Sequence, residues 1–418
     1  MKRAAYCAFY LFITSILISC TLANQGTARD DELIKPEDKI GEMTVEQGST
    51  VPYPYIWKFC KDMPDEHEPL SFTSECEVPM LSGLDITIGW FAKETKFASN
   101  WDAMTWELSI DGNEVALEDF DTYESDYIQH GEDNKERRWT ITLKNLSPGK
   151  HTLQYSWNSK LAIDDGFNVY KPGVYEQVVN FTVLEKAVYP PFSSTAKVGQ
   201  HPYRSEKAQL DFLLYLSGEY GKDSQQERPV IVFLHGAHLR GATLELLKEE
   251  SLPKKLENET DFPFIVVSPL GDGEYEFWAQ DEMIDPLFTL LDEIQTVLSV
   301  DPQRIYLTGN DMGGNGVWAI GLRYPEFFAA LAPVAGYFGY PFEVPDNICD
   351  LKDTPVWAFH GRRDEIIPVE VEQDLVDALI ACGGDAQITI SPDMKIDVPY
   401  KVYENPELYD WLLSQKLK

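Results

Sequence analysis

The residues with the clearest chemistry lie in the segment Leu307-Thr-Gly-Asn-Asp-Met-Gly-Gly314. Hydrolases with a serine nucleophile hold it in a Gly-x-Ser-x-Gly turn, where a strand ends sharply, a helix begins, and small neighbours relieve crowding. Gly309 and Gly313 flank such a turn here, but Asp311 stands at the serine position. A carboxylate needs no base to activate it, yet it is a weak nucleophile toward esters. The sequence therefore predicts a hydrolase-type turn whose reacting atom has changed.

Short apolar runs predict the elements that position this turn. The run 305–307 is of strand type and leads into the turn, and a helix is expected from Asn315 to Arg323. His235-Gly236 and Asp364 each come soon after a run of the same type. Three more buried strands are predicted, at 229–234, 264–267 and 354–361. A carboxylate that follows the nucleophile along the chain fits the order Ser, Asp, His.

With these motifs, residues from about 200 to 418 resemble the feruloyl esterase, acetyl-xylan esterase and polyhydroxybutyrate depolymerase-like branch of the α/β-hydrolases. The matching phrases are PVIVFLHGA, DPQRIYLTGNDMGGNGVWAIGLRYPEFFAALAPVAGY, TPVWAFHGRRDEIIPV and NPELYDWLLSQ. The resemblance implies an α/β fold with a doubly wound sheet. It also implies that Asp364 is the triad acid, that the backbone amides of Ala237 and Met312 form the oxyanion hole, and that Ile396 stands where the family has its catalytic histidine.

The histidines test this alignment, because the chain has only seven: His67, His130, His151, His201, His235, His238 and His360. None follows Asp364, so the expected general base is missing, and only a histidine from outside the usual order, such as His201 or His238, would replace it. The oxyanion loop also departs from the family's HGAGERG, since it reads HGAHLRG at 235–241.

Three interpretations of the site remain. The first is a non-catalytic descendant that binds a carbohydrate or ester ligand, and the second is an active carboxylic-ester hydrolase with displaced catalytic residues. In the third, Asp311 attacks as the aspartate of dehalogenase-like members does, but the histidine that would activate water is absent. With no imidazolium between Asp311 and Asp364, we expect a raised pKa in one of them or a nearby cation. Arg362, Arg363 and Lys395 are the candidates for that cation.

The N-terminus predicts export. Lys2 and Arg3 form a positive region, and Ala4 to Ile18 is an apolar stretch of the length of a secretory signal. Leu17-Ile-Ser-Cys20 matches a bacterial lipobox, which predicts that Cys20 carries lipid and anchors the protein to a membrane at the cell surface or in the periplasm. The alternative is ordinary signal cleavage near Ala23, with Cys20 lost.

Four cysteines remain after Cys7 and Cys20 are assigned to the signal and the lipid. Export favours disulfides, and we expect the pairs Cys60–Cys76 and Cys349–Cys382, one in each half of the chain. The alternative is four unrelated buried thiols. Because no cysteine or histidine cluster has the spacing of metal ligands, we expect neither a metal site nor a cofactor.

The net charge of the chain restricts the kinds of molecule that it is expected to bind. The 69 acidic and 35 basic residues give a net charge of −34, which becomes −36 when Lys2 and Arg3 leave with the signal. Such a surface repels nucleic acid and anionic lipid, so we expect no nucleic-acid partner. A small-molecule or polysaccharide ligand that is neutral or cationic fits this charge.

Composition divides the chain into a signal peptide at 1–20, a tether at 21–38, an immunoglobulin-like β-sandwich at 39–186, a linker at 187–200 and a hydrolase-like domain at 201–418. The sandwich is predicted from short alternating strands at 84–90, 105–110, 138–143, 151–157 and 177–183. Its many aromatic residues include Trp90, Trp101, Trp106, Trp139 and Trp157. Exposed rings of this kind bind sugars, but alternation predicts that most lie in the core. A purely architectural role for both domains is a further alternative.

Overall fold

The computed structural model describes residues 33–48, 53–61, 72–129, 132–222, 226–271, 278–339, 342–395 and 397–417. The predicted signal peptide, the lipidation residue Cys20 and the residue at the lost histidine position, Ile396, lie outside these ranges.

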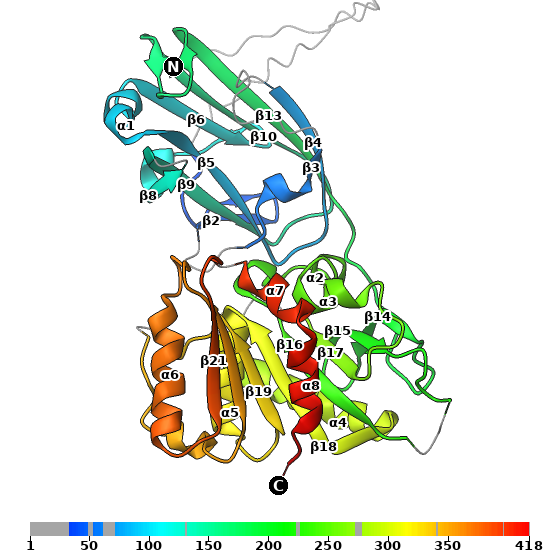
Figure 1. Cartoon of the computed structure of the whole chain (residues 1–418). Coiled ribbons are helices and arrows are strands. Elements are labelled where there is room, and N and C mark those ends of the chain that lie inside the picture. The colour runs from blue at the N-terminus through cyan, green and yellow to red at the C-terminus, as the bar shows by residue number, and fades with distance from the viewer. Residues whose placement is uncertain are drawn as a thin grey trace, which may run out of the picture. The chain divides into compact units, whose positions relative to one another are not determined.

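The N-terminal region is built almost entirely from strands (Figure 1). Its strands are β1 (Lys39–Ile40), β2 (Met43–Gln47), β3 (Cys60–Lys61), β4 (Phe72–Val78), β5 (Gly83–Lys93), β6 (Met104–Ile110), β7 (Asn113–Glu114), β8 (Thr122–Gln129), β9 (Glu132–Lys144), β10 (Gly149–Ser159), β11 (Ile163–Asp164), β12 (Val169–Tyr170) and β13 (Gly173–Val183). Its helical segments are η1 (Ile56–Phe59), α1 (Glu94–Trp101) and η2 (Leu117–Asp119).

Two sheets share the core of this region. One has the order β1-β2-β9-β5 with β8 on β9, and the other has the order β3-β4-β13-β10-β6-β7. Ile86 from the first sheet and Leu153 and Val179 from the second are fully buried in one cluster. Each of the five predicted strands lies within a longer observed strand. The immunoglobulin-like classification stays a prediction.

The C-terminal region has a single eight-stranded sheet with the order β14-β15-β17-β16-β18-β19-β20-β21. The strands are β14 (Gly199–Ser205), β15 (Leu210–Leu216), β16 (Arg228–Leu234), β17 (Ile265–Pro269), β18 (Val300–Asn310), β19 (Ala330–Val334), β20 (Val356–Gly361) and β21 (Ala386–Ser391). The first two strands run antiparallel to their neighbours, and the others are parallel. This is the strand order of the α/β-hydrolase fold, as the sequence predicted.

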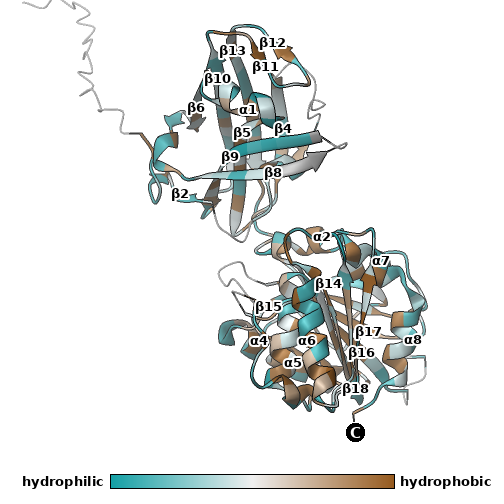
Figure 2. Ribbon diagram, turned by 60° about the vertical axis from the view of Figure 1, so that its left-hand side comes forward, coloured by the Kyte–Doolittle hydropathy of each residue, from teal (hydrophilic) through white to brown (hydrophobic). Residues whose placement is uncertain are grey.

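Helices cover both faces of this sheet, as a buried parallel sheet requires. They are α2 (Leu244–Leu247), α3 (Ser251–Leu256), α4 (Asp281–Val297), α5 (Met312–Arg323), α6 (Val369–Ala381), α7 (Val398–Glu404) and α8 (Pro406–Ser414), with the short turns η3 (Ala237–Leu239) and η4 (Ile348–Leu351). Val232 of β16 faces a core shared with α4, α5 and α6, whereas its neighbour Phe233 faces one shared with α2, α3, α7 and α8. Accordingly, α6 carries both hydrophobic and hydrophilic residues (Figure 2).

The strand before the turn is longer than predicted. The sequence indicates a strand at 305–307, but β18 begins at Val300. Val300 pairs with Arg228 and Ile305 pairs with Val230, so the Asp-Pro-Gln-Arg segment between them is the extra length of an irregularity in the pairing with β16. Asp301 supports this start, because its Oδ1 accepts a hydrogen bond of 3.0 Å from the Gln303 amide.

The segments predicted as tether and linker are partly structured. Ile34 donates a backbone hydrogen bond of 2.8 Å to Glu114. In the linker, Phe192 is buried in the hydrolase core, and the backbones of Pro190 and Phe192 bond to Arg204 of β14. These residues therefore belong to the folded regions on either side.

Both predicted disulfides are present, and they join Cys60 to Cys76 and Cys349 to Cys382. The first links neighbouring strands β3 and β4, and the second links η4 to the end of α6. Among the residues that the structure describes, no helix is both long and apolar enough to cross a membrane.

Candidate active site

Asp311 occupies a strained turn between β18 and α5. Its backbone has φ 56° and ψ −117°, a conformation that non-glycine residues rarely adopt. The glycines on either side are required by packing, since a Cβ on Gly309 would lie 2.6 Å from the Leu234 carbonyl oxygen and one on Gly313 would lie 2.0 Å from it. The helix begins at Met312, before the predicted start at Asn315. The turn thus has the geometry of a nucleophile elbow.

The Asp311 carboxylate binds the two amides predicted to form the oxyanion hole. The Ala237 amide donates a hydrogen bond of 2.9 Å to Asp311 Oδ2, and the Met312 amide also bonds to this carboxylate. Burial raises the pKa of the Asp311 carboxyl, and these two amides only partly offset that effect. The negative charge of Asp364 raises it further. The Asp311 carboxylate thus occupies the position in which these amides would otherwise bind the oxygen of an acyl intermediate.

His235 shapes the loop that carries Ala237. The residue is fully buried, and its Nε2 accepts a hydrogen bond of 3.0 Å from the Gly271 amide while its Nδ1 donates to the Gly236 carbonyl at 2.9 Å. Trp278 donates its indole N–H to the His235 carbonyl. Burial lowers the pKa of His235 to about 4, so the ring is neutral at pH 7. Its role is to position the loop.

Asp364 lies after β20, where the resemblance places the triad acid, and its side chain is fully buried. Its Oδ1 accepts hydrogen bonds of 2.9 Å from the amides of Ile366 and Ile367. Its Oδ2 has no hydrogen-bond partner in the described part of the chain. In a complete triad, one carboxylate oxygen accepts the Nδ1 proton of the histidine. The free oxygen is therefore consistent with the loss of that histidine.

A buried ion pair beside Asp364 was not predicted. His360 Nδ1 donates to Glu372 Oε2 at 2.7 Å and its Nε2 donates to the Ile367 carbonyl at 2.9 Å, so both ring nitrogens carry protons. Burial opposes the charged ring, but the Glu372 carboxylate outweighs it and raises the pKa of His360. His360 Nε2 lies 3.8 Å from Asp364 Oδ2.

His360 is thus the buried cation of the site, and the three predicted cations are not. Lys395 pairs with Glu365 at 3.1 Å and Arg363 with Asp393 at 3.2 Å, and both pairs are solvent-exposed. The Arg362 residue is exposed as well. The three named cations were wrong, because their side chains reach solvent whereas the His360 ring is buried. The other expectation, a raised pKa in one of the two carboxyls, is met at Asp311.

Of the two histidines proposed as displaced bases, only His238 lies near Asp311. A Cβ built on Gly236 would be 3.2 Å from both His238 Nδ1 and Asp311 Oδ2, and His238 lowers the pKa of Asp311. His238 Nε2 lies 3.5 Å from Glu250 Oε2. His201 instead bonds to the Val198 carbonyl at 2.9 Å on the edge strand β14.

The sequence missed two further residues beside the elbow. Burial raises the pKa of the Tyr337 hydroxyl, and the charge of Asp311 raises it further, so this phenol keeps its proton near the elbow. Asn310 is buried, and its Oδ1 has no hydrogen-bond partner among the described residues. Asn310 was visible as a polar residue at the end of an apolar strand, but Tyr337 carried no local signal.

No group of three or more histidine, cysteine, aspartate or glutamate side chains in the described ranges has the geometry to hold a metal ion. The ionisable side chains around the elbow are the half-buried Asp311, the buried Asp364, His360 and Glu372, and the partly exposed His238.

Part of the hydrolase-like region is similar to known proteins. Residues 274–395, which include the elbow and Asp364, match the model of the Dienelactone hydrolase family. A protein of Nocardia uniformis subsp. tsuyamanensis provisionally named as the esterase NocK is 25% identical over 154 residues, which is 34% of this chain and 42% of that protein. One of Yersinia pestis, provisionally named as a carboxymethylenebutenolidase, is 29% identical over 101 residues, 22% of this chain and 36% of that protein.

The chain thus spans less than half the length of these two relatives. A solved structure described as a thermostable esterase has a TM-score of 0.43 and 19% identity, and the alignment covers 82% of this chain and 99% of that one. The C-terminal region has an α/β-hydrolase fold, and its residues 274–395 are similar to the Dienelactone hydrolase family.

Proposed function

We propose that this protein is an esterase-like binding protein without turnover, exported and held at a membrane through Cys20. The observation that carries the proposal is the hydrogen bond from the Ala237 amide to Asp311 Oδ2. An ester carbonyl gains its largest stabilisation when its oxygen becomes negative against such amides. Here a carboxylate already occupies them, so a substrate carbonyl would have to displace a charged side chain.

The lack of a general base supports the same proposal. Acyl transfer needs a base to take a proton from the nucleophile and return it to the leaving group. Asp364 would orient that base, but its Oδ2 has no hydrogen-bond partner in the part of the chain that the structure describes. His360 is protonated, and its two ring nitrogens already donate hydrogen bonds to Glu372 and to the Ile367 carbonyl. Among the described residues, no imidazole therefore lies within hydrogen-bond distance of Asp364 Oδ2, as the triad requires.

The site around the elbow would bind an ester-decorated or plain polysaccharide fragment. The carboxylates of Asp311 and Asp364 disfavour an anionic ligand, and the net charge of −34 acts in the same direction. A neutral ligand with hydroxyl groups would donate hydrogen bonds to Asp311 instead of placing a carbonyl oxygen there. The polysaccharide class rests on the family resemblance.

The proposal is tested by restoring the missing groups. Hydrolysis of p-nitrophenyl acetate and methyl ferulate would be measured for the wild type, Asp311→Ser, Ile396→His and the double variant, with thermal melts to establish folding. We expect an inert wild type and weak turnover only in the double variant, because general-base help contributes about 10²–10⁴-fold. Multiple turnovers by the wild type that vanish in Asp311→Ala would refute the proposal.

A second candidate function is ester hydrolysis with a displaced base. His238 next to Asp311, with Glu250 3.5 Å from its Nε2, is an imidazole with an orienting carboxylate. Hydrogen bonds from His238 and Tyr400 outweigh burial and lower the pKa of Glu250 to about 2, so it is ionised. In this scheme His238 removes a proton from the water that attacks the ester carbonyl, and it returns the proton to the alcohol as the ester C–O bond breaks. Activity that disappears in His238→Ala but persists in His201→Ala would favour it.

A further inference from the structure

One end of the N-terminal β region presents a cluster of apolar side chains to solvent. Thirteen large hydrophobic side chains are exposed among the described residues, and four of them fall within residues 161–174: Leu161 at 65%, Phe167 at 40%, Val169 at 71% and Val174 at 62%. This stretch, the hairpin tip, contains the β11–β12 hairpin and the start of β13. Figure 2 shows β11 and β12 at one end of the region, partly in brown. Exposed apolar side chains that gather in this way indicate an interaction site.

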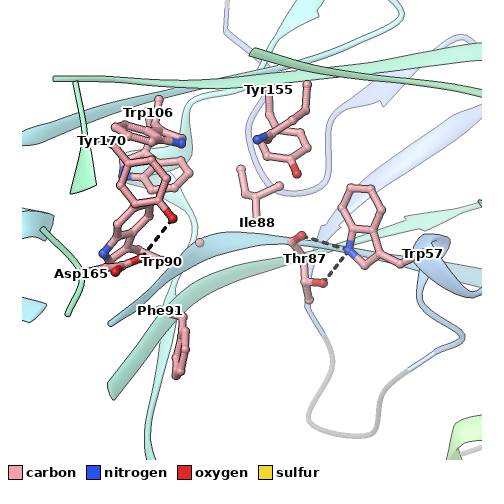
Figure 3. Close-up of a pocket in the computed structure, with 12 residues that line it drawn as sticks. Trp57, Thr87, Ile88, Trp90, Phe91, Trp106, Tyr155, Asp165 and Tyr170 are labelled. Atoms are coloured by element: carbon pink, nitrogen blue, oxygen red, sulfur yellow. Dashed lines mark hydrogen bonds between the residues drawn. The ribbon is translucent and has the colours of Figure 1, made fainter. Parts of the chain in front are cut away.

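The hairpin tip is held in place by the residues on its inner side. Ile163 of β11 is only 1% exposed and lies in one hydrophobic cluster with Trp90 and Trp157. Tyr170 of β12 meets both indoles edge to face, with ring centroids 5.5 and 5.7 Å away. Its hydroxyl donates a hydrogen bond of 3.0 Å to Asp165 Oδ2 (Figure 3). Because the inner side of the hairpin is already packed, the apolar side chains on its outer side stay in solvent.

The backbone amides of the turn have their partners inside the tip. Asp165 Oδ1 accepts hydrogen bonds from the amides of Phe167 and Asn168, at 2.6 and 2.5 Å. The Gly166 amide donates to Asp164 Oδ1 at 2.9 Å, and the Asp165 amide donates to the Asn168 carbonyl at 3.1 Å. A backbone amide that enters lipid must be bonded within the protein, since no water is present there. The amides from 165 to 168 meet this requirement.

The charged residues that flank the hairpin in the sequence are lysines. Lys160 precedes β11 and Lys171 follows β12, and both are exposed. Of the two carboxylates within the tip, Asp165 is buried in the turn, and Asp164 pairs with Lys96 at 2.7 Å. The chain as a whole carries a net charge of −34. Repulsion from distant acidic groups fades beyond a Debye length of about 8 Å at physiological ionic strength, so the lysines dominate at contact.

Lysines beside exposed apolar side chains fit a bilayer with anionic headgroups, because the amines meet the phosphates while the apolar groups enter the acyl boundary. A third lysine contributes, since Lys93 Nζ lies 5.5 Å from the centroid of the Phe167 ring. A stable protein interface needs roughly 20–30 residues on each side, more than this tip offers. We propose that the hairpin tip docks on an anionic bilayer, independently of the function proposed for the elbow and of a lipid at Cys20.

The test uses residues 23–418, which contain every described residue, so that neither the apolar stretch 4–18 nor a lipid at Cys20 contributes. Co-sedimentation at physiological ionic strength measures binding to vesicles of phosphatidylcholine alone and of phosphatidylcholine mixed in equal parts with phosphatidylglycerol. The wild type is expected to bind the mixed vesicles more tightly. Val169→Asn is expected to weaken that binding about tenfold, because it removes an inserted apolar side chain. Lys160→Gln and Lys171→Gln are each expected to weaken it about fivefold.

Two matched controls carry the same changes outside the tip. Val188, which is 93% exposed, lies between β13 and β14, and Lys150 lies at the start of β10, whereas Lys160 follows the end of that strand. Val188→Asn and Lys150→Gln are expected to bind like the wild type, and thermal melts establish that every variant folds.

The proposal is wrong if the wild type binds neither kind of vesicle or binds both equally, or if tip and control variants lose affinity alike. It is also wrong if Val169→Asn abolishes a dimer in sedimentation velocity and leaves vesicle binding unchanged, because the tip would then be an interface between copies of the chain.

Discussion

The Ala237 amide and the Asp311 carboxylate, 74 positions apart in the sequence, are joined by a hydrogen bond of 2.9 Å. One comes from the loop after β16 and the other from the elbow after β18, and these strands are neighbours in the sheet. In a serine hydrolase, this amide waits for charge that develops during the reaction. Here the negative charge at the amide comes from Asp311 of the same protein. The arrangement therefore resembles an oxyanion hole that is occupied by one of the protein's own side chains.

Asp311→Asn is expected to stabilise the fold at neutral pH by roughly 1–2 kcal/mol. Because the pKa of Asp311 is raised, the folded protein holds this proton more tightly than the unfolded chain does. The proton bound to Asp311 contributes stability that is present below the pKa of the unfolded chain, about 3.9. This stability is lost as the pH rises through the pKa of Asp311 in the folded protein. The amide carries no charge, and its oxygen still accepts from Ala237. Urea unfolding of the wild type and Asp311→Asn at pH 4 and pH 7.5 measures the difference in their free energies of unfolding. An equal gain in stability at both pH values would contradict the prediction.

His235 is expected to make stability depend on acidity in the opposite direction. Burial lowers the pKa of His235 from 6.5 to about 4, so its stabilising contribution is complete above pH 6.5 and is lost as pH falls toward 4. The loss amounts to about 3 kcal/mol. The excess stability of the wild type over His235→Asn should therefore shrink by this amount between pH 7 and pH 4. An NMR titration of the ring with a midpoint near 6.5 would show that the explanation is wrong.

Glu372→Ala is expected to lower the free energy of unfolding by about 3–5 kcal/mol, because it leaves the protonated His360 buried without a counterion. It also removes the acceptor of the Trp318 indole N–H. Glu370→Ala is the matched control, since Glu370 is exposed on the same helix and its loss should change stability by about 0.5 kcal/mol at most. Chemical denaturation compares the two variants. Similar losses in both would mean that the pair with His360 contributes little.

Local motifs predicted most of this site. The glycines around Asp311, the strand before His235 and the acid at Asp364 are each readable within a few residues, because the turn geometry and strand burial restrict them directly. The His360–Glu372 pair was not predicted, since it joins a strand end to a helix through space. A signal existed in α6, where Glu372 falls on the apolar face between Val369 and the buried leucines that follow. A charged residue on a buried face needs a partner, and the sequence alone does not name it.

The disulfides give the last prediction. Cys349 and Cys382 are 33 positions apart, and a crosslink of this length stabilises a fold by about 3–4 kcal/mol through the unfolded chain. The double change to alanine should therefore lower the melting temperature of the hydrolase region in calorimetry. The same change at Cys60 and Cys76, 16 positions apart, is the counterpart in the β region. If each disulfide stabilises its own region, each double variant lowers the melting temperature of a different unfolding transition. If both double variants shift the same transition, the two regions unfold as one unit.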